Sequence, residues 1–416
     1  MMLEINIALL TIGGLVILLG LFSSLIKGRF FISDPIVALF VGILISSGGL
    51  DLVHLEHWGK PEAILEQSAR LAIAIQVMGV ALRLPKGYLF KHWQPLAILL
   101  GLVMPLMWLV SGLLVYLILG LPFWVSLLIG AIITPTDPVI ATSVVTGTIA
   151  EQNLPARIRY TLSTESAAND GLGYAFVFLP ILLLTKPPGE AIFHWLTKTL
   201  IWEVGVAVIL GGVFGYIAGK LLLWSEAKKM LEKHSFLAYT VALSIFVLAA
   251  VKLLGSDGIL AVFVSGVMFS MVVNGRDRAQ EEQVQEAIDR FFTLYIFVIL
   301  GLNLPWQQWL ELGWSGLFLV GAILLLRRLP AVLALKNQIS SIIKWTDALF
   351  MGWFGPIGVA AVFYANLSVQ RVGLESIWVV SSLMICASIL IHGLTAVPFT
   401  KFYGKTNEPI IFYEQS

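Results

Sequence analysis

Residues 129–147 read IGAIITPTDPVIATSVVTG, and residues 160–184 read YTLSTESAANDGLGYAFVFLPILLL. Both stretches are apolar and long enough to cross a lipid bilayer, for which an α-helix needs about 20 residues. They nevertheless carry three carboxylates, Asp137, Glu165 and Asp170. A charged side chain at the centre of a membrane helix costs about 2.5–3.5 kcal/mol on insertion scales, so such residues usually mark an ion or proton pathway. We therefore expect these two stretches to contain an ion site.

The composition of the whole chain is typical of a polytopic membrane protein. Of its 416 residues, 58% are hydrophobic and only 12% are charged, and the mean hydropathy is +0.91. The formal net charge of +1 gives no reason to expect nucleic acid as a partner, and the lipid bilayer is the expected surrounding. The single cysteine, Cys386, cannot form a disulfide within the chain, and we expect no cofactor.

Apolar runs separated by proline, glycine or charged residues predict an all-α protein with about 13 membrane-spanning helices. Their approximate limits are 5–26, 34–52, 64–82, 93–119, 123–147, 159–184, 197–224, 235–254, 257–274, 287–303, 314–335, 343–368 and 374–400. Only about 16 residues follow the last span, so we interpret residues 1–416 as a single transmembrane unit without a soluble domain.

The distribution of basic residues predicts the orientation of the chain. Arg70, Arg327 and Arg328 lie within spans; of the other lysines and arginines, 18 follow odd-numbered spans and 5 follow even-numbered spans. Because cytoplasmic loops carry the excess of Lys and Arg, we expect the N-terminus outside and the C-terminus in the cytoplasm, with the protein in the plasma (inner) membrane.

Two spans are interrupted in the middle. Span 5 contains TPTDP at residues 134–138, and span 12 contains GPIG at residues 355–358. Interruptions by glycine and proline at matching positions in two halves indicate the binding site of an inverted-repeat transporter. With span 7 as a linker, spans 1–6 form the first repeat and spans 8–13 the second, and their odd offset of seven makes the repeats inverted. Two ordinary kinked helices are the alternative interpretation.

A break inside the membrane leaves backbone N–H and C=O groups that only protein, water or an ion can satisfy. A small cation is a natural occupant of such a place. Thr136 supplies a hydroxyl and a carbonyl oxygen there. We expect Asp137 to lie beside the positive end of the half-helix that follows it.

Helical spacing divides the polar residues of span 6 between two faces. Ser166 and Asp170 are four residues apart and share one face, and Glu165 and Asn169 share the neighbouring face. We therefore assign Asp170 and Ser166 to the ion, and Glu165 and Asn169 to holding the structure.

Glu165 needs a buried cation as its partner, and span 11 offers two candidates. Arg327 and Arg328 lie well inside its apolar run. A buried carboxylate and a buried guanidinium neutralise one another, whereas either alone is costly. The spacing does not decide between the two arginines. Snorkelling of both side chains to the cytoplasmic surface is the alternative.

The residues also resemble a known family, over nearly the whole chain. The TDP of residues 136–138, the ESxxND of residues 165–170, the RxxxV of residues 328–332 and the GPxG of residues 355–358 resemble the NhaP-type sodium/proton antiporters, in the sodium/proton exchanger branch of the cation:proton antiporter superfamily. The resemblance implies a homodimeric secondary transporter, not an enzyme. It would exchange a monovalent cation, Na⁺ first, for H⁺ by elevator-like alternating access, with a role in pH homeostasis.

The resemblance also implies a role for each site residue. Asp170 is the carboxylate that binds cation or proton in competition, with Na⁺ held at Asp170, Thr136 and Ser166. Asp137 also lines this ion site. The supporting network would consist of Asn169, Glu165 and Arg328. Asparagine before the aspartate resembles the electroneutral, one-for-one branch, whereas relatives with two aspartates are electrogenic.

Two positions depart from the pattern of the family. Many relatives have arginine or lysine before the last glycine of GPxG, where this chain has Ile357. Some relatives carry an acidic residue near the position of Gln76. A K⁺/H⁺ antiporter of the same fold is therefore the first alternative function.

Two further interpretations concern other residue pairs. An intramembrane aspartyl protease would use Asp137 and Asp170, but such proteases place the second aspartate directly after Gly-x-Gly, where this chain has Tyr174. His54 and His57, beside Glu56, have metal-ligand side chains. We interpret that short outer loop as a solvated turn.

Overall fold

The computed structural model describes residues 2–26, 29, 31–137, 140, 142–230, 235–273 and 278–407, and no β-strand occurs among them. Within this part of the chain, seven helices are long and apolar enough to cross a membrane, and four shorter apolar helices accompany them. The prediction of an all-α polytopic membrane protein is confirmed. The number of crossings and the inverted repeat stay predictions.

The helices follow one another along the chain with these bounds: α1 (Met2–Leu25), α2 (Asp34–Ile45), η2 (Leu55–His57), α3 (Pro61–Arg83), α4 (Tyr88–Lys91), α5 (Trp93–Ile98), η3 (Leu99–Val103), α6 (Met104–Leu119), α7 (Phe123–Ile132), α8 (Thr142–Val145), α9 (Gly147–Asn153), α10 (Ala156–Thr185), α11 (Pro188–His194), η4 (Trp195–Gly205), α12 (Val206–Ala227), α13 (Ser235–Leu253), α14 (Gly258–Val272), α15 (Arg278–Leu302), α16 (Trp306–Leu326), α17 (Leu329–Leu335), α18 (Trp345–Trp353), α19 (Val359–Val372) and α20 (Glu375–Thr406). Each of the thirteen predicted stretches overlaps at least one of these helices.

Two predicted spans need correction. The second ends as a helix at Ile45 rather than at residue 52, because Ser46 turns the chain by donating its hydroxyl to Ile43 O at 2.8 Å. The eleventh is not continuous, since α16 ends at Leu326 and α17 begins at Leu329. Arg327 and Arg328 therefore lie at a joint between two helices, and Pro330 in the first turn of α17 is compatible with a helix that restarts there.

The two interruptions predicted from glycine and proline are present. Span 5 is divided between α7 and α8, and the described residues 133–137 between them are not helical. Span 12 is divided into α18 and α19 by the non-helical residues 354–358. Pro138, which we expected to contribute to the first break, lies outside the described residues.

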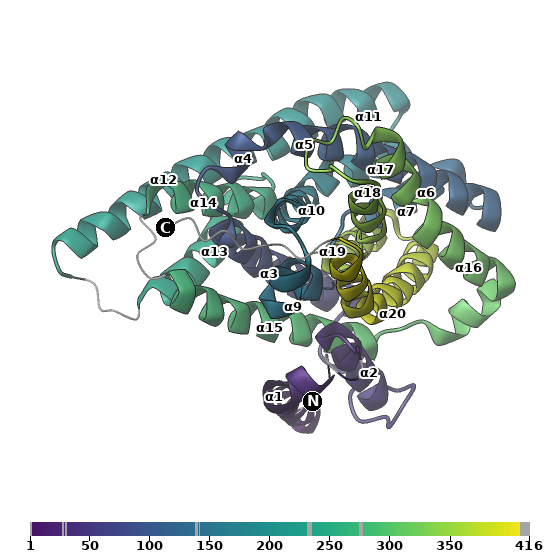
Figure 1. Cartoon of the computed structure of the whole chain (residues 1–416). Helices are drawn as coiled ribbons and strands as arrows, with labels where there is room; N and C mark the ends of the chain where they lie inside the picture. Colours follow the sequence, from purple (N-terminus) through teal and green to yellow (C-terminus); the bar gives the residue numbers. More distant parts are fainter. Residues whose placement is uncertain are drawn as a thin grey trace.

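Helix α10 lies at the centre of the molecule, where it contacts α3, α7, α14, α18 and α19 (Figure 1). In its most apolar window 72% of the residues are buried, against 22% for α1, which lies at the edge (Figure 1). Small residues allow the closest helix approach, where Gly211 and Gly215 of α12 face the backbone of Ala261 and Ser265 of α14. The polar residues of α10 are therefore enclosed by other helices rather than by lipid.

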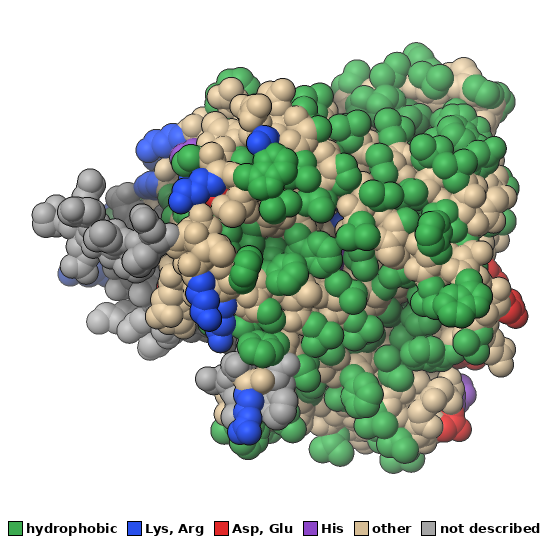
Figure 2. Space-filling view, turned by 45° about the vertical axis from the view of Figure 1, so that its right-hand side comes forward, with side chains coloured by type: hydrophobic (Ala, Val, Ile, Leu, Met, Phe, Trp, Pro, Cys, Tyr) green, Lys and Arg blue, Asp and Glu red, His purple; other side chains and the backbone are tan. Residues whose placement is uncertain are grey.

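Hydrophobic side chains cover the middle of the molecular surface in a broad belt (Figure 2). Lys and Arg gather at the left end of this view, and Asp and Glu at the right end (Figure 2). Many of the exposed side chains on the long helices are large and apolar, among them Leu10, Ile17, Leu117, Ile201 and Phe318. An apolar belt between two charged ends is the surface that a bilayer requires.

Candidate functional site

The two broken helices cross at their interruptions. The backbone N–H of Asp137 donates to the carbonyl oxygen of Pro356 at 2.8 Å. Residues 133–137 and 354–358 therefore lie against each other, although more than 200 residues separate them in the sequence. The crossing lies beside α10, since a Cβ on Gly173 would come within 2.8 Å of Pro135.

The carboxylate of Asp137 closes the N-terminal end of α19. Its Oδ2 accepts from the backbone N–H of Val359 at 2.6 Å. The sequence predicts a place for Asp137 beside the half-helix that follows it, and that prediction stays open because residues 138, 139 and 141, which lead into α8, lie outside the described residues. The positive helix end that Asp137 is shown to meet belongs to the other broken helix. The two segments pass so close there that a Cβ on Gly358 would clash with Asp137 Oδ2.

Arg327 bonds the free carbonyl groups at the same crossing. Its guanidinium donates to Ile133 O, to Thr134 O at 3.1 Å, and to Gly355 O. The first two carbonyls follow the end of α7 and the third follows the end of α18. The positive side chain of Arg327 thus satisfies the negative C-terminal ends of α7 and α18, while the negative side chain of Asp137 satisfies the positive N-terminal end of α19. Sequence reasoning missed this role of Arg327, and the only signal for it was a second arginine beside Arg328.

Glu165 pairs with Arg328. The two guanidinium nitrogens NH1 and NH2 donate to Oε1 and Oε2 at 2.6 and 2.7 Å, a bidentate arrangement. The third donor, Nε, bonds Met351 O at 2.9 Å. Glu165 and Arg328 are only 2% and 3% exposed, so neither side chain snorkels to the surface. The choice that the sequence left open is therefore decided in favour of Arg328.

Asp170 differs from the other two carboxylates of the site. It is 2% exposed, and its Oδ1 has no hydrogen-bond partner among the described residues. Nearby donors bond its backbone instead, since the hydroxyl of Tyr364 donates to Asp170 O at 2.6 Å. A buried carboxylate oxygen without a donor is costly unless a proton or a cation satisfies it. Tyr364 was not predicted, because nothing in its sequence context distinguishes it from a core aromatic residue.

Thr136 links the break in span 5 to α10. Ser166 donates its hydroxyl to Thr136 O, and Thr136 Oγ1 lies 3.3 Å from Ser166 Oγ. Asn169 holds Thr136 from both sides: its Oδ1 accepts from Thr136 N at 3.0 Å, and its Nδ2 donates to Thr136 Oγ1 at 2.9 Å. Because this amide already has partners in Thr136, its contacts are those of a positioning residue. The two Thr136 oxygens each keep a further lone pair.

A second support for the crossing comes from α20, and the sequence analysis did not name it. Ser388 Oγ accepts from the backbone N–H of Ile357 at 2.7 Å and lies 3.0 Å from His392 Nδ1. His392 Nε2 lies 3.1 Å from Trp353 O, at the end of α18. Serine and histidine four residues apart on a helix share a face, which was the available signal.

The site therefore combines three carboxylates with three different environments. Asp137 caps a helix and Glu165 is ion-paired, whereas Asp170 keeps a buried oxygen without a donor among the described residues, one helical turn after Ser166 on α10. Carboxylate, hydroxyl and carbonyl oxygens are hard ligands that suit hard cations. The arrangement can hold a small dehydrated cation or a proton on Asp170. The roles of the individual residues in transport stay predictions.

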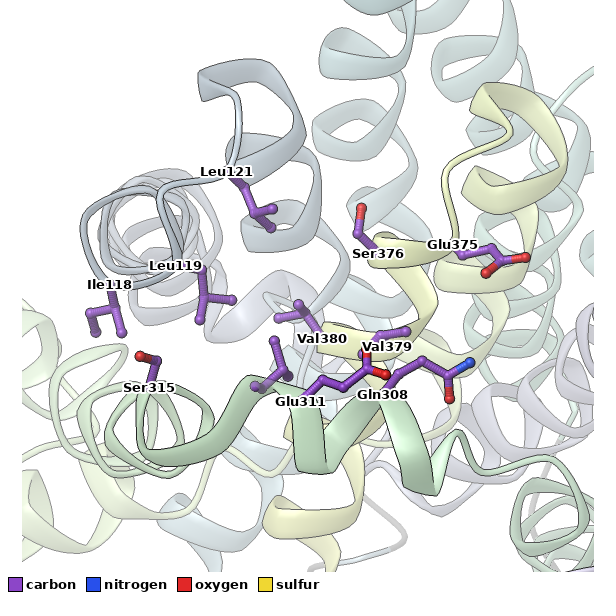
Figure 3. Close-up of a pocket in the computed structure, with 11 residues that line it drawn as sticks. Ile118, Leu119, Leu121, Gln308, Glu311, Ser315, Glu375, Ser376, Val379 and Val380 are labelled. Atoms are coloured by element: carbon purple, nitrogen blue, oxygen red, sulfur yellow. The ribbon is translucent and has the colours of Figure 1, made fainter.

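Two cavities lie apart from this site. One, of about 440 Å³, lies between the end of α6, α16 and the start of α20, where Gln308, Glu311 and Ser376 are among its lining residues (Figure 3). The other, of about 520 Å³, has Glu203 and Arg371 in its wall. Asp170 lines neither cavity, so neither of them gives it a direct opening to the surface.

The pair of Glu165 and Arg328 yields the first prediction. Glu165→Ala or Arg328→Ala alone should lower the free energy of unfolding by about 3–5 kcal/mol, because the remaining charge is buried without its partner. The double variant should recover part of this loss. The measurement is unfolding in detergent, followed by helical signal against denaturant. Arg157→Ala serves as the control, since Arg157 pairs with Asp347, and its effect should add to that of Glu165→Ala. Additive losses for Glu165 and Arg328 would contradict the pairing.

Comparison with known proteins places the chain among membrane exchangers. A family model described as "Sodium/hydrogen exchanger, transmembrane" matches residues 14–402. The chain is 35% identical to Na(+)/H(+) antiporter 2 of Zygosaccharomyces rouxii, over 90% of this chain and 51% of that protein. It is 28% identical to a Na(+)/H(+) antiporter of Schizosaccharomyces pombe, over 94% of this chain and 89% of that protein. It is 25% identical to the K(+)/H(+) antiporter NhaP2 of Shewanella sp. (strain MR-4), over 92% of this chain and 64% of that protein.

A solved structure has the same fold. The sodium proton antiporter MjNhaP1 from Methanocaldococcus jannaschii, at pH 8, superposes with a TM-score of 0.72 at 19% identity, over 97% of this chain and 98% of that chain. The chain spans about half the length of several of the curated relatives it matches. The family model, in contrast, covers nearly the whole chain. The resemblance noted in the sequence is thereby confirmed, and the chain belongs to the transmembrane sodium/hydrogen exchanger family.

Proposed function

We propose that this protein exchanges a monovalent cation, Na⁺ in the first instance, for H⁺ by alternating access, with Asp170 binding either one in competition. The observation that carries the proposal is the buried Oδ1 of Asp170, which has no hydrogen-bond donor among the described residues and lies on the same helix face as Ser166. Membership of the exchanger family supports it, as do the relatives that are named as Na⁺/H⁺ antiporters.

Competition at one carboxylate couples the two fluxes. With a cation or a proton bound, the charge of Asp170 is neutralised, whereas the empty site would bury an uncompensated negative charge. The state that changes its access is therefore the loaded one, and each ligand leaves only when the other replaces it. Thr136 and Ser166 supply oxygens that replace part of the hydration shell of the cation. Asn169 fixes Thr136, and Glu165 with Arg328 fixes the helices around it.

The environments of the other polar groups favour a one-for-one, electroneutral cycle. Asn169 next to Asp170 does not titrate. Glu165 is neutralised by Arg328, and Asp137 is engaged by the backbone of α19. One exchangeable negative charge is then left in the site. The engagement of Asp137 also leaves it poorly suited to act as the second aspartate of an intramembrane protease, which would need both carboxylates at one water molecule.

A K⁺/H⁺ exchanger is the second candidate, because some relatives carry that name. We propose a homodimer in the plasma (inner) membrane, serving pH homeostasis, with the N-terminus outside and the C-terminus in the cytoplasm. The basic side chains at one end of the apolar belt would face the cytoplasm, and the acidic side chains at the other end would face outside (Figure 2). We propose no cofactor other than the transported ions.

The second prediction concerns the ligand role of Thr136. Thr136→Val removes a hydroxyl oxygen without touching the titrating carboxylate, so it should raise the apparent KM for the cation by about tenfold, equivalent to about 1.4 kcal/mol, and change the maximal rate less. The measurement is cation-dependent pH change in proteoliposomes. Thr134→Val is the matched control, because the Thr134 hydroxyl already donates to Gly130 O in the last turns of α7. An unchanged KM in folded Thr136→Val would contradict the ligand role of Thr136, and the break in span 5 would then only bend the helix.

The third prediction tests the exchange carboxylate. Asp170→Asn keeps the size of the side chain but neither titrates nor attracts a cation, so the protein should fold and exchange should fall to the background of empty liposomes. Glu190→Gln, at an exposed position after α10, should exchange like the unchanged protein. Activity that persists in folded Asp170→Asn would move the site to Asp137.

The fourth prediction concerns stoichiometry. Cation-driven proton flux should not respond to an imposed membrane potential, because a cycle that moves no net charge gains nothing from the about 2.3 kcal/mol per charge that 100 mV supplies. The same proteoliposomes, clamped at different potentials with valinomycin and K⁺ gradients in a Na⁺ assay, give the measurement. Flux that accelerates with potential contradicts the one-for-one cycle. A larger flux with K⁺ than with Na⁺, measured without valinomycin, would favour the second candidate.

A further inference from the structure

Three side chains that the transport site does not use meet near the predicted outer face. Glu4 lies in the first turn of α1, and His54 and His57 lie between α2 and α3. Glu4 Oε1 is 2.7 Å from His57 Nδ1 and 3.3 Å from His54 Nδ1. One ligand atom from each of the three residues lies within 4.8 Å of the other two. The sequence showed the two histidines beside Glu56, but the carboxylate that joins them is Glu4, about 50 residues away.

We propose that Glu4, His54 and His57 bind a divalent transition-metal ion of the zinc class. Two imidazoles and one carboxylate are the donor set of zinc sites that keep an open position. With bonds of about 2.0–2.2 Å, the ligand atoms of a tetrahedral site are roughly 3.3–3.5 Å apart. The observed 3.3 Å between Glu4 and His54 already fits this spacing. The 2.7 Å between Glu4 and His57 needs to widen by less than an ångström, as the metal replaces the proton that the two groups share.

Asp51 gives this cluster the outer support of a metal site. Its Oδ1 lies 2.8 Å from His54 Nε2. Metal-binding histidines usually donate their second ring N–H to a carboxylate, which fixes the tautomer and the orientation of the ring. When Nε2 carries that proton, the lone pair of Nδ1 faces the oxygen of Glu4. Two acceptors at this distance repel each other unless a proton or a metal cation lies between them. Asp51 is therefore a positioning residue.

A metal ion can reach the cluster from solvent. The side chain of His57 is 57% exposed and that of His54 is 32% exposed, whereas that of Glu4 is 12% exposed. The open side leaves room for water as the fourth ligand. Imidazole nitrogen together with a carboxylate selects zinc, copper or nickel over the alkali cations of the transport site, so the two sites would not compete for the same ion.

Metal binding would fasten the first helix to the rest of the protein. Helix α1 is the least buried of the seven long apolar helices of the described chain, and it packs at the edge against α2 and α15 (Figure 1). Without a metal, hydrogen bonds between Glu4 and the two histidines join the first turn of α1 to the α2–α3 connection. Coordination bonds would replace these with stronger links, and binding to the folded state would stabilise it by mass action.

The test is a zinc titration of the full-length protein in detergent, purified without a histidine tag and stripped of metal. Zn²⁺ is titrated against a chromogenic chelator at constant pH. We expect one zinc ion per chain. Glu4→Gln and His57→Ala should each weaken binding at least tenfold, and Asp51→Asn should weaken it about tenfold, the usual effect of an outer-shell carboxylate. Glu56→Gln and His194→Ala, which change neighbouring and remote groups of the same kinds, should bind like the unchanged protein.

Hydrogen–deuterium exchange gives a second readout that depends on the role of Glu4. Zinc should slow amide exchange at the start of α1 in the unchanged protein and in Glu56→Gln, but not in Glu4→Gln. Absence of one-to-one zinc binding in the unchanged protein overturns the proposal, and this outcome needs no variant. Equal zinc affinity and equal slowing of exchange in Glu4→Gln also overturn it, since the metal would then be held by the histidine loop or by another part of the chain.

Discussion

The structure depends on satisfying the broken backbone inside the membrane. Non-helical segments at this depth are stable only where protein, water or an ion meets their polar groups. Arg327 donates to carbonyl oxygens that follow the ends of α7 and α18, and Asp137 accepts a hydrogen bond from the first backbone N–H of α19. Each charge meets a helix end of opposite sign, so the charges and the dipoles compensate one another. The crossing can therefore persist in a low-dielectric interior without a bound ion.

The three buried carboxylates of the site are satisfied in different ways. Asp137 is held by the backbone N–H of Val359, and Glu165 is neutralised by Arg328. Asp170 lies equally deep but keeps an oxygen without a donor among the described residues. A group that is stable only with a bound proton or cation is a natural exchange site, since its burial penalises the empty state. The proposed supporting role of Asn169 rests on its amide, whose oxygen and nitrogen both bond Thr136.

The sequence was most reliable where one local cause was sufficient. The breaks in spans 5 and 12 follow from proline and glycine placed close together in the middle of an apolar run, whereas the single prolines Pro180 and Pro398 lie inside the continuous helices α10 and α20. The sequence was less reliable where the contacts of a residue depend on a partner far away in the chain. The helix joint at Arg327 and Arg328 was not foreseen, because an apolar run with two arginines reads as continuous. The contact of Asp137 with the start of α19 was not foreseen either, since Val359 lies more than 200 residues away in the sequence.

By itself, the sequence determined the helical membrane fold, the places of the two interruptions, and the need of Glu165 for a buried cation. These follow from hydropathy, from the geometry of proline and from the cost of a lone buried charge, all of which are properties of short segments. Only the tertiary structure decided which arginine meets Glu165, which helix end Asp137 caps, and that Glu4 joins the two histidines. The physical reason is that these choices depend on the relative rotation and depth of helices far apart in the chain, and a shift of one residue on a helix turns a side chain by about 100°.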